Sequence, residues 1–147
     1  MSGAEFGQSL QTLVVETAGP GLTDVTLKVR AWLNEITAGD GLLTLFIRHT
    51  SASLVIQENA DPDVHIDLID ALDRLAPRDR AYVHDTEGPD DMPAHIKAAV
   101  TATSLSIPLE DGRMMLGTWQ GIYLVEHRDR PHRREIVLHY LGTRGTR

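Results

Sequence analysis

Apolar residues in the middle of the chain recur with helical spacing. Four of them follow one another at intervals of four, four and three residues: Val64, Leu68, Leu72 and Leu75. This spacing places them on one face of a helix. The preceding segment 59–63, Asn-Ala-Asp-Pro-Asp, is typical of a helix start because it offers a capping acid and a proline for the first turn. The pattern predicts an amphipathic helix that ends before Pro77.

Two further helices are indicated. One follows the capping residues at 23–24 and carries apolar residues at near-helical spacing as far as Ile36. The other begins after an aspartate at 90–91, with Pro93 in its first turn. The short segment 38–41, Ala-Gly-Asp-Gly, has the composition of a turn.

The remaining apolar runs predict strands. The segment 42–48 is too apolar for a solvent-facing strand, so we expect a central strand that is buried on both faces. Asp-Gly at 111–112 predicts a hairpin turn. The other extended segments are Ser9–Thr17, Leu54–Gln57, Ser104–Leu109, Met114–His127 and Glu135–Leu141. Strands and helices do not alternate regularly, and this favours an α+β fold with a mainly antiparallel sheet.

Composition narrows the class of protein. The chain has 147 residues without a linker or repeat, which predicts one domain over 1–147, with 142–147 as a loose tail. It has no cysteine, so a transition-metal site must use histidine and carboxylate ligands. A net charge of −7 argues against nucleic-acid binding. No apolar run could span a membrane and no signal peptide is evident, so we expect a cytoplasmic protein.

Several histidines lie where predicted elements end. His49, His84 and His127 end extended segments, and His95 lies on the short helix that follows the acidic turn. Ends of elements are where sites are commonly built, and imidazole is the commonest metal ligand. Each histidine could equally cap a backbone group or lie on the surface. In an extended strand Glu126 and His127 point to opposite faces, and we take His127 as the ligand.

Acids, hydroxyls and arginines supply the other candidate groups. Four acids, Asp85, Glu87, Asp90 and Asp91, could cap a helix, or could orient ligands and carry protons. Thr50, Ser51 and Ser53 could hold phosphate oxygens, or could bond to backbone groups of a turn. Arg113 and Arg128 are candidate partners of an anionic substrate.

Longer segments carry a resemblance to a known family. They are HTSASL at 49–54, ENADPD at 58–63, HDTEGPDDMPAHI at 84–96, SIPL at 106–109, GTWQGIYL at 117–124 and EHR at 126–128. These segments resemble the successive signature blocks of the YjbQ-like family, over residues 8–142. The middle block is long and specific.

The resemblance implies packed β-sheets, a homotrimer and secondary thiamine-phosphate synthase activity. That reaction joins a pyrimidine pyrophosphate to a thiazole phosphate and releases pyrophosphate. It further implies a bound metal, expected to be zinc, held by His84, His95 and His127. His49, Asp85, Glu87 and Asp91 are then candidate catalytic residues, and Asn59 and Gln120 join the substrate-binding candidates.

A histidine site is an unusual choice for pyrophosphate chemistry, which normally uses Mg²⁺ held by oxygen ligands. A metal with an open coordination position could instead activate water. A metal-dependent hydrolase of a small phosphorylated or heterocyclic substrate is therefore one alternative. The other is a non-catalytic binding or assembly protein whose histidines only stabilise the fold.

Overall fold

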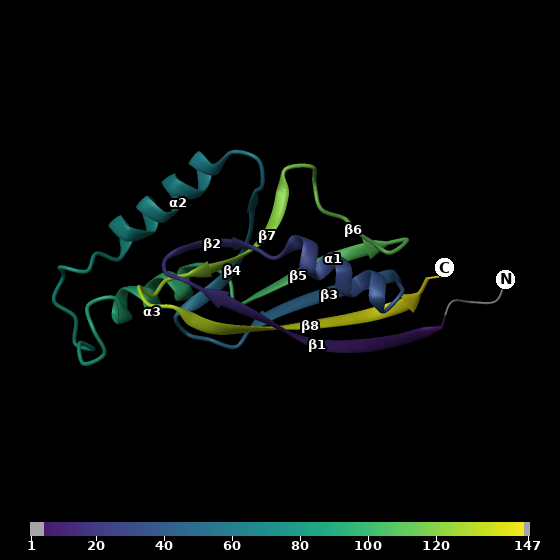
Figure 1. Ribbon diagram of the computed structural model, residues 1–147, viewed down its shortest axis with the longest axis horizontal. Coiled ribbons are helices and arrows are strands. Elements are labelled where there is room, and N and C mark those ends of the chain that lie inside the picture. Colours follow the sequence, from purple (N-terminus) through teal and green to yellow (C-terminus); the bar gives the residue numbers. More distant parts are fainter. Residues whose placement is uncertain (1–4, 146–147) are drawn as a thin grey trace.

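Two antiparallel sheets and three helices make up residues 5–145, the part of the chain that the computed structural model describes (Figure 1). The larger sheet has the strand order β1 (Phe6–Thr17), β8 (His132–Arg144), β3 (Ala38–Ile47), β5 (Ser104–Glu110) and β6 (Arg113–Met114). The smaller sheet has the order β2 (Gly21–Asp24), β7 (Gln120–Glu126) and β4 (Ala52–Glu58). The expected α+β class is confirmed.

All three expected helices form, and the local sequence explains where they begin. Helix α2 (Pro62–Leu75) starts at a proline, and the side chain of Asp61 accepts a hydrogen bond from the backbone N–H of Asp63. Helix α3 (Asp91–Val100) follows Asp90 as its N-cap, and α1 (Thr26–Glu35) follows β2. Figure 1 shows α2 projecting from one end of the molecule, and none of its residues is buried. No helix among residues 5–145 is long and apolar enough to cross a bilayer.

Strand β3 is central in the larger sheet, as expected, but it is not buried on both faces. Leu43, Leu45 and Ile47 face the core, whereas Leu42 and Phe46 are 41% and 48% exposed. Helix α1 and the smaller sheet cover only the inner face, so the outer face of this chain is open. Segment 38–41 is the first part of β3 and not a turn, because the chain reverses at Thr37, whose φ is 57°.

The Asp-Gly hairpin is confirmed, with φ angles of 52° at Asp111 and 77° at Gly112. The prediction of one long extended segment after this hairpin is wrong. Residues 115–119 form a loop, and β7 begins at Gln120 in the other sheet. The loop is closed by Gln120, whose side-chain oxygen accepts a hydrogen bond from the backbone N–H of Gly117 at 2.7 Å.

Residues 142–144 also depart from expectation, because they belong to β8 and not to a loose tail. Gly142 is paired with both Gly7 and Gly41. A Cβ at Gly142 would lie 2.3 Å from the backbone oxygen of Asp40, so only glycine allows the strands to approach this closely. Residue 145 is also described, while residues 146–147 of the expected tail lie outside the described residues.

The core lies between the inner face of the larger sheet, helix α1 and the smaller sheet. Strand β7 is buried from Gly121 to Glu126. Ala52 is paired with Glu126 at one end of the smaller sheet, and Glu58 is paired with Gln120 at the other. Helix α3 packs against β4. This arrangement brings three segments together at the Ala52 end: the start of β4, the residues after β7 and helix α3.

Candidate metal centre

The acidic turn and α3 bring two histidines to one carboxylate. His84 Nε2 lies 2.6 Å from Asp91 Oδ2, and His95 Nε2 lies 3.2 Å from the same oxygen. Asp91 and His95 are four residues apart on α3 and so share a face of the helix. These three side chains form the one group of potential metal ligands found among residues 5–145, with all ligand atoms within 4.8 Å of one another. We call this group the His84–Asp91–His95 cluster.

The tautomer of His95 determines which group can lie between its Nε2 and the Asp91 carboxylate. His95 Nδ1 lies 3.0 Å from the backbone oxygen of Thr50. A carbonyl oxygen can only accept, so Nδ1 carries the proton and donates it. In the neutral ring Nε2 is then an acceptor, and it faces a carboxylate oxygen, which is another acceptor. Two acceptors at 3.2 Å need a cation between them, either an added proton or a metal ion.

Asp91 is held as an anion although it is buried. Burial alone would raise the pKa of its carboxyl group. The hydrogen bond from His84 and the charges of His95 and Arg128 outweigh burial, so the pKa of Asp91 lies below its usual range. The carboxylate is therefore ionised at neutral pH and supplies the negative charge that a cation site requires.

Arg128 fixes the orientation of that carboxylate. Its Nη1 donates to Asp91 Oδ1 at 2.7 Å, and its Nε donates to Asp90 Oδ2 at 2.8 Å. Its Nη2 donates to the backbone oxygen of Glu87 at 3.3 Å. The guanidinium of Arg128, which was expected to bind substrate, is thus hydrogen-bonded to the acidic turn. Bonding one carboxylate oxygen to Arg128 leaves the other aimed at the two imidazoles.

The two remaining acids of the turn are exposed. Glu87 is the last and smallest of the named influences that lower the pKa of Asp91. Asp85 lines a cavity that also contains His84. Asp90 has a different role, because its Oδ2 accepts hydrogen bonds from Arg128 and from the backbone N–H of Asp129. Asp85 and Glu87 are therefore open to solvent on the same acidic turn as Asp91.

His127 lies outside the cluster and is 3% exposed. Its Nε2 is 2.9 Å from Ser53 Oγ, and Thr101 Oγ1 is 2.6 Å from the same hydroxyl. Burial, assisted by the charge of Lys97, lowers the pKa of His127 to about 4. His127 is therefore neutral at pH 7. Ser53 is 1% exposed, so its hydroxyl bonds to His127 beneath α3 and not to a surface ligand.

His49 is also placed elsewhere, at the end of β3. Its Nε2 accepts a hydrogen bond from the backbone N–H of Glu135 at 2.9 Å. Burial, and then the charge of Arg134, lowers the pKa of His49. Its acceptor nitrogen is thus occupied by the backbone of β8. Of the neighbouring hydroxyl residues, Ser51 accepts from Arg134 and Thr50 is exposed.

A buried ion pair that the composition did not predict stabilises the regions around His49 and His127. Arg134 and Glu126 are 4% and 1% exposed and are joined by two hydrogen bonds. Glu126 also accepts from Thr17 and from the backbone N–H groups of residues 127 and 128. No spacing of residues in the sequence indicates that Arg134 and Glu126 form this ion pair. Only the alternation of β8, which places Arg134 in register with core residues, could have indicated that it points inward.

Three expected substrate-binding residues are remote from the cluster. Asn59 and Gln120 lie at the opposite end of the smaller sheet, which six residue steps along β4 put about 20 Å away. The side-chain amide of Asn59 donates to the backbone oxygen of Thr118 at 3.1 Å, so it stabilises the 115–119 loop. Arg113 lies in the hairpin strand β6. The structure therefore separates these residues from the His84–Asp91–His95 cluster.

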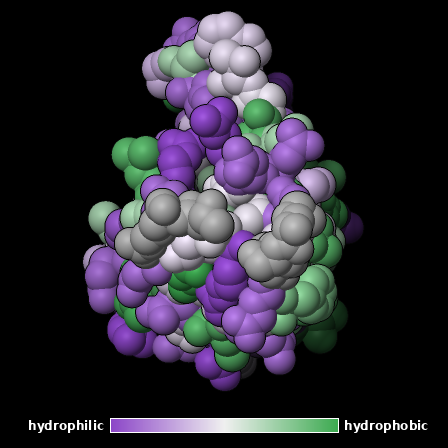
Figure 2. All heavy atoms as spheres, turned by 90° about the vertical axis from the view of Figure 1, so that its right-hand side faces the viewer, coloured by the Kyte–Doolittle hydropathy of each residue, from purple (hydrophilic) through white to green (hydrophobic). Residues whose placement is uncertain are grey.

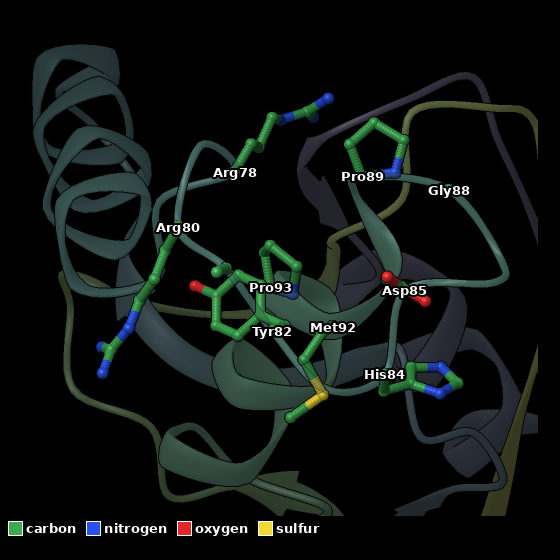
Figure 3. A pocket seen from close by; sticks show the side chains of 10 residues that line it. Arg78, Arg80, Tyr82, His84, Asp85, Gly88, Pro89, Met92 and Pro93 are labelled. Atoms are coloured by element: carbon green, nitrogen blue, oxygen red, sulfur yellow. The ribbon is translucent and has the colours of Figure 1, made fainter.

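A cavity of about 380 Å³ adjoins the cluster (Figure 3). His84 belongs to both the cavity and the cluster. The cavity is also lined by Arg78, Arg80, Tyr82, Asp85 and Met92. Its size is within the range of small-molecule sites, about 300–1,000 Å³. A small ligand in it would lie directly beside the candidate cation position.

Comparison with known proteins identifies the family of the chain. A family model described as UPF0047 protein YjbQ-like matches residues 11–143. A UPF0047 protein of Synechocystis sp. is 52% identical over 142 residues, covering 96% of this chain and 97% of that protein. YugU of Bacillus subtilis, another UPF0047 protein, is 35% identical over 134 residues, covering 90% and 99%.

Solved structures show the same fold. A YjbQ/UPF0047 family protein from Clostridium acetobutylicum has a TM-score of 0.82 and 37% identity, covering 88% of this chain and 98% of that one. A protein of Sulfolobus solfataricus has a TM-score of 0.87 over 94% of this chain and 99% of its own, and at 24% identity it supports the fold alone. The chain belongs to the YjbQ-like (UPF0047) family.

Proposed function

We propose that this protein is a metal-dependent enzyme acting on a small phosphorylated or heterocyclic substrate. The specific activity that we propose is that of a thiamine-phosphate synthase. The single observation that carries the metal dependence is the meeting of two acceptors. His95 Nδ1 donates to the backbone oxygen of Thr50, so a proton or a metal ion must lie between Nε2 and the ionised, buried Asp91 carboxylate. A divalent cation at this position would satisfy both groups and His84.

The donor set fits zinc or another transition metal better than magnesium. Two imidazoles and one carboxylate are ligands of catalytic zinc and of Fe²⁺ sites, whereas Mg²⁺ prefers oxygen alone. The 3.2 Å between His95 Nε2 and Asp91 Oδ2 is close to the edge of a zinc tetrahedron, about 3.3 Å for bonds of about 2.0–2.1 Å. The 2.6 Å between His84 and Asp91 is a hydrogen bond that a metal would replace.

A bound metal would act as a Lewis acid and keep a coordination position open for substrate. The chain's own groups would do the rest. Arg128 orients Asp91, Thr50 orients His95, and the exposed carboxyl group of Glu87 or Asp85 exchanges protons beside the cluster. His49 is a weaker candidate for the proton carrier because its acceptor nitrogen is bonded to the backbone of Glu135.

The same cluster supports hydrolysis as a second candidate function, because three protein ligands leave a position for water. The two reactions differ in what they require. A synthase releases pyrophosphate from the pyrimidine pyrophosphate only when the thiazole phosphate is present. A hydrolase acts on the pyrimidine pyrophosphate alone. The third alternative, a non-catalytic protein, releases pyrophosphate in neither case.

The test begins with metal analysis of the purified protein and zinc titration of the metal-free chain. We expect one zinc per chain, and a loss of affinity on the order of 1,000-fold for His95→Ala, more than the 10–100-fold typical of residues that only support a ligand. His127→Gln distinguishes this cluster from the ligand set that the sequence suggests, and should bind zinc normally. His139→Gln, a substitution of a half-buried histidine on β8 outside the cluster, is a matched control. A wild-type chain without zinc affinity would refute metal dependence, and pyrophosphate release then separates the reactions.

We further infer that the chain assembles as a homotrimer, the state implied by its resemblance. Support comes from apolar side chains on the outer face of the larger sheet: Phe6, Leu10, Leu42, Phe46 and Leu141, all at least 41% exposed. Figure 2 shows apolar side chains among polar ones on the surface at the end where the termini lie. Light scattering should give about three times the chain mass of 16.2 kDa. Phe46→Glu should lower that mass, and a wild-type monomer would contradict the inference.

A further inference from the structure

The cavity beside His84 has two chemically different ends. Figure 3 shows Tyr82, Met92 and Pro93 grouped between Arg80 on one side and His84 with Asp85 on the other. The middle is therefore apolar. One end carries a guanidinium, and the other carries an imidazole of the His84–Asp91–His95 cluster and an acid. This polarity limits which ligand can lie along the cavity.

The positive charge at the first end is available for a ligand. Two arginines line the cavity, but Arg78 is bonded through both terminal nitrogens to the carboxylate of Asp129. Arg80 is exposed, and its guanidinium has no hydrogen-bond or ion-pair partner among residues 5–145. The anionic residue that lines the cavity, Asp85, is drawn on the opposite side from Arg80. An anion is thus attracted to the Arg80 end and repelled from the Asp85 end.

The apolar middle is fixed in place before any ligand binds. The Tyr82 hydroxyl donates to the backbone oxygen of Pro77 at 2.7 Å, which holds the ring against the cavity. Pro93 is buried in the first turn of α3, and Met92 precedes it, next to the ligand residue Asp91. A preformed apolar wall costs little entropy when a flat group packs on it.

We propose that this cavity binds a small organic phosphate whose apolar, flat body packs on Tyr82 and Met92. Its phosphate binds Arg80, and its other end faces the cluster at His84. Arginine suits this role because its planar fork pairs with phosphate oxygens. The inference rests on the proposed function only for the end that faces His84. Arg80 and the apolar wall bind the rest of the ligand whether or not a metal is present.

Phenyl phosphate is the probe, because it joins a flat ring to a phosphate. Calorimetric titration of metal-free and zinc-loaded protein should show phenyl phosphate binding at least about 10-fold more tightly than either inorganic phosphate or phenol, since each lacks one half of the contacts. Arg80→Ala should weaken phenyl phosphate binding by about 10-fold or more without changing zinc affinity. Arg80→Lys should recover part of the loss because it restores charge without the fork.

Arg74→Ala is the matched control, since Arg74 is an exposed arginine that pairs with Asp70 and does not line the cavity. It should leave phenyl phosphate affinity unchanged. Equal affinity of the wild type and Arg80→Ala for phenyl phosphate would overturn the proposal, as would phenol binding as tightly as phenyl phosphate. Because the metal-free protein is titrated as well, failure to bind zinc would refute metal dependence without deciding the cavity's ligand.

Discussion

Two pairs of histidines with similar positions in the sequence have opposite surroundings in the structure. His84 and His95 share the Asp91 carboxylate at a partly open site. Neither His49 nor His127 bonds to an acid. His49 bonds to the backbone N–H of Glu135 and to the guanidinium of Arg134, and His127 bonds to the hydroxyl of Ser53. The first pair favours a cation between its members and the acid. The second pair has lowered pKa values and stays neutral.

The comparison shows that a histidine becomes a candidate ligand through its partner more than through its place at the end of an element. An anion held by Arg128 can compensate for a metal's charge, whereas the Ser53 hydroxyl cannot. The two pairs are nonetheless connected. Glu126 accepts from the backbone of residues 127 and 128, so one buried acid positions both His127 and the arginine that orients Asp91.

The largest effect that would sharpen this comparison is the pH dependence of stability caused by His127. Its pKa is about 4 in the folded chain, against 6.5 for a histidine side chain in water. The folded pKa is lowered, so the neutral imidazole stabilises fully above pH 6.5. As the pH falls toward 4, the unfolded chain takes up a proton that the buried ring refuses, which costs about 3 kcal/mol by pH 4.

Urea unfolding between about pH 7.5 and about pH 4.5 measures this contribution in wild type and in His127→Gln. Glutamine keeps a polar group for Ser53 but does not titrate. The variant should therefore lose less stability on acidification than the wild type does. Parallel curves for the two proteins would show that His127 is not a buried neutral imidazole, whatever the variant's stability at neutral pH.

A smaller effect is expected for Arg128, which orients Asp91 and therefore affects the site of His84 and His95 but not that of His49 and His127. Arg128→Gln leaves Asp91 without the bond that aims it at the imidazoles. We expect zinc affinity to fall by about 10–100-fold, the range for residues that orient a ligand. Competition with a zinc-binding dye measures the change, and Arg133→Gln, which removes an exposed arginine paired with Glu135, serves as the control. If the Arg128→Gln variant binds zinc as tightly as the wild type, Arg128 does not orient a zinc ligand.

Much of the fold follows from local patterns. The periodicity ending at Leu75, the Asp-Gly turn at 111–112 and the proline in the first turn of α3 each depend on a few neighbouring residues, and each prediction is confirmed. The failures involve distant partners. Leu42 and Phe46 were expected to be buried because composition cannot show that only one face of the larger sheet is covered within this chain.

The site divides in the same way. The sequence by itself determined the family, the acidic turn and the i,i+4 pair Asp91 and His95, because these depend on short-range order. Only the tertiary structure decided that Arg128 bonds to Asp91 and that His127 bonds to Ser53. It also separated Asn59 and Gln120 from the cluster by the length of a strand. The physical reason is that alternation along a strand gives the face of a side chain, whereas its partner depends on which other segment packs against that face.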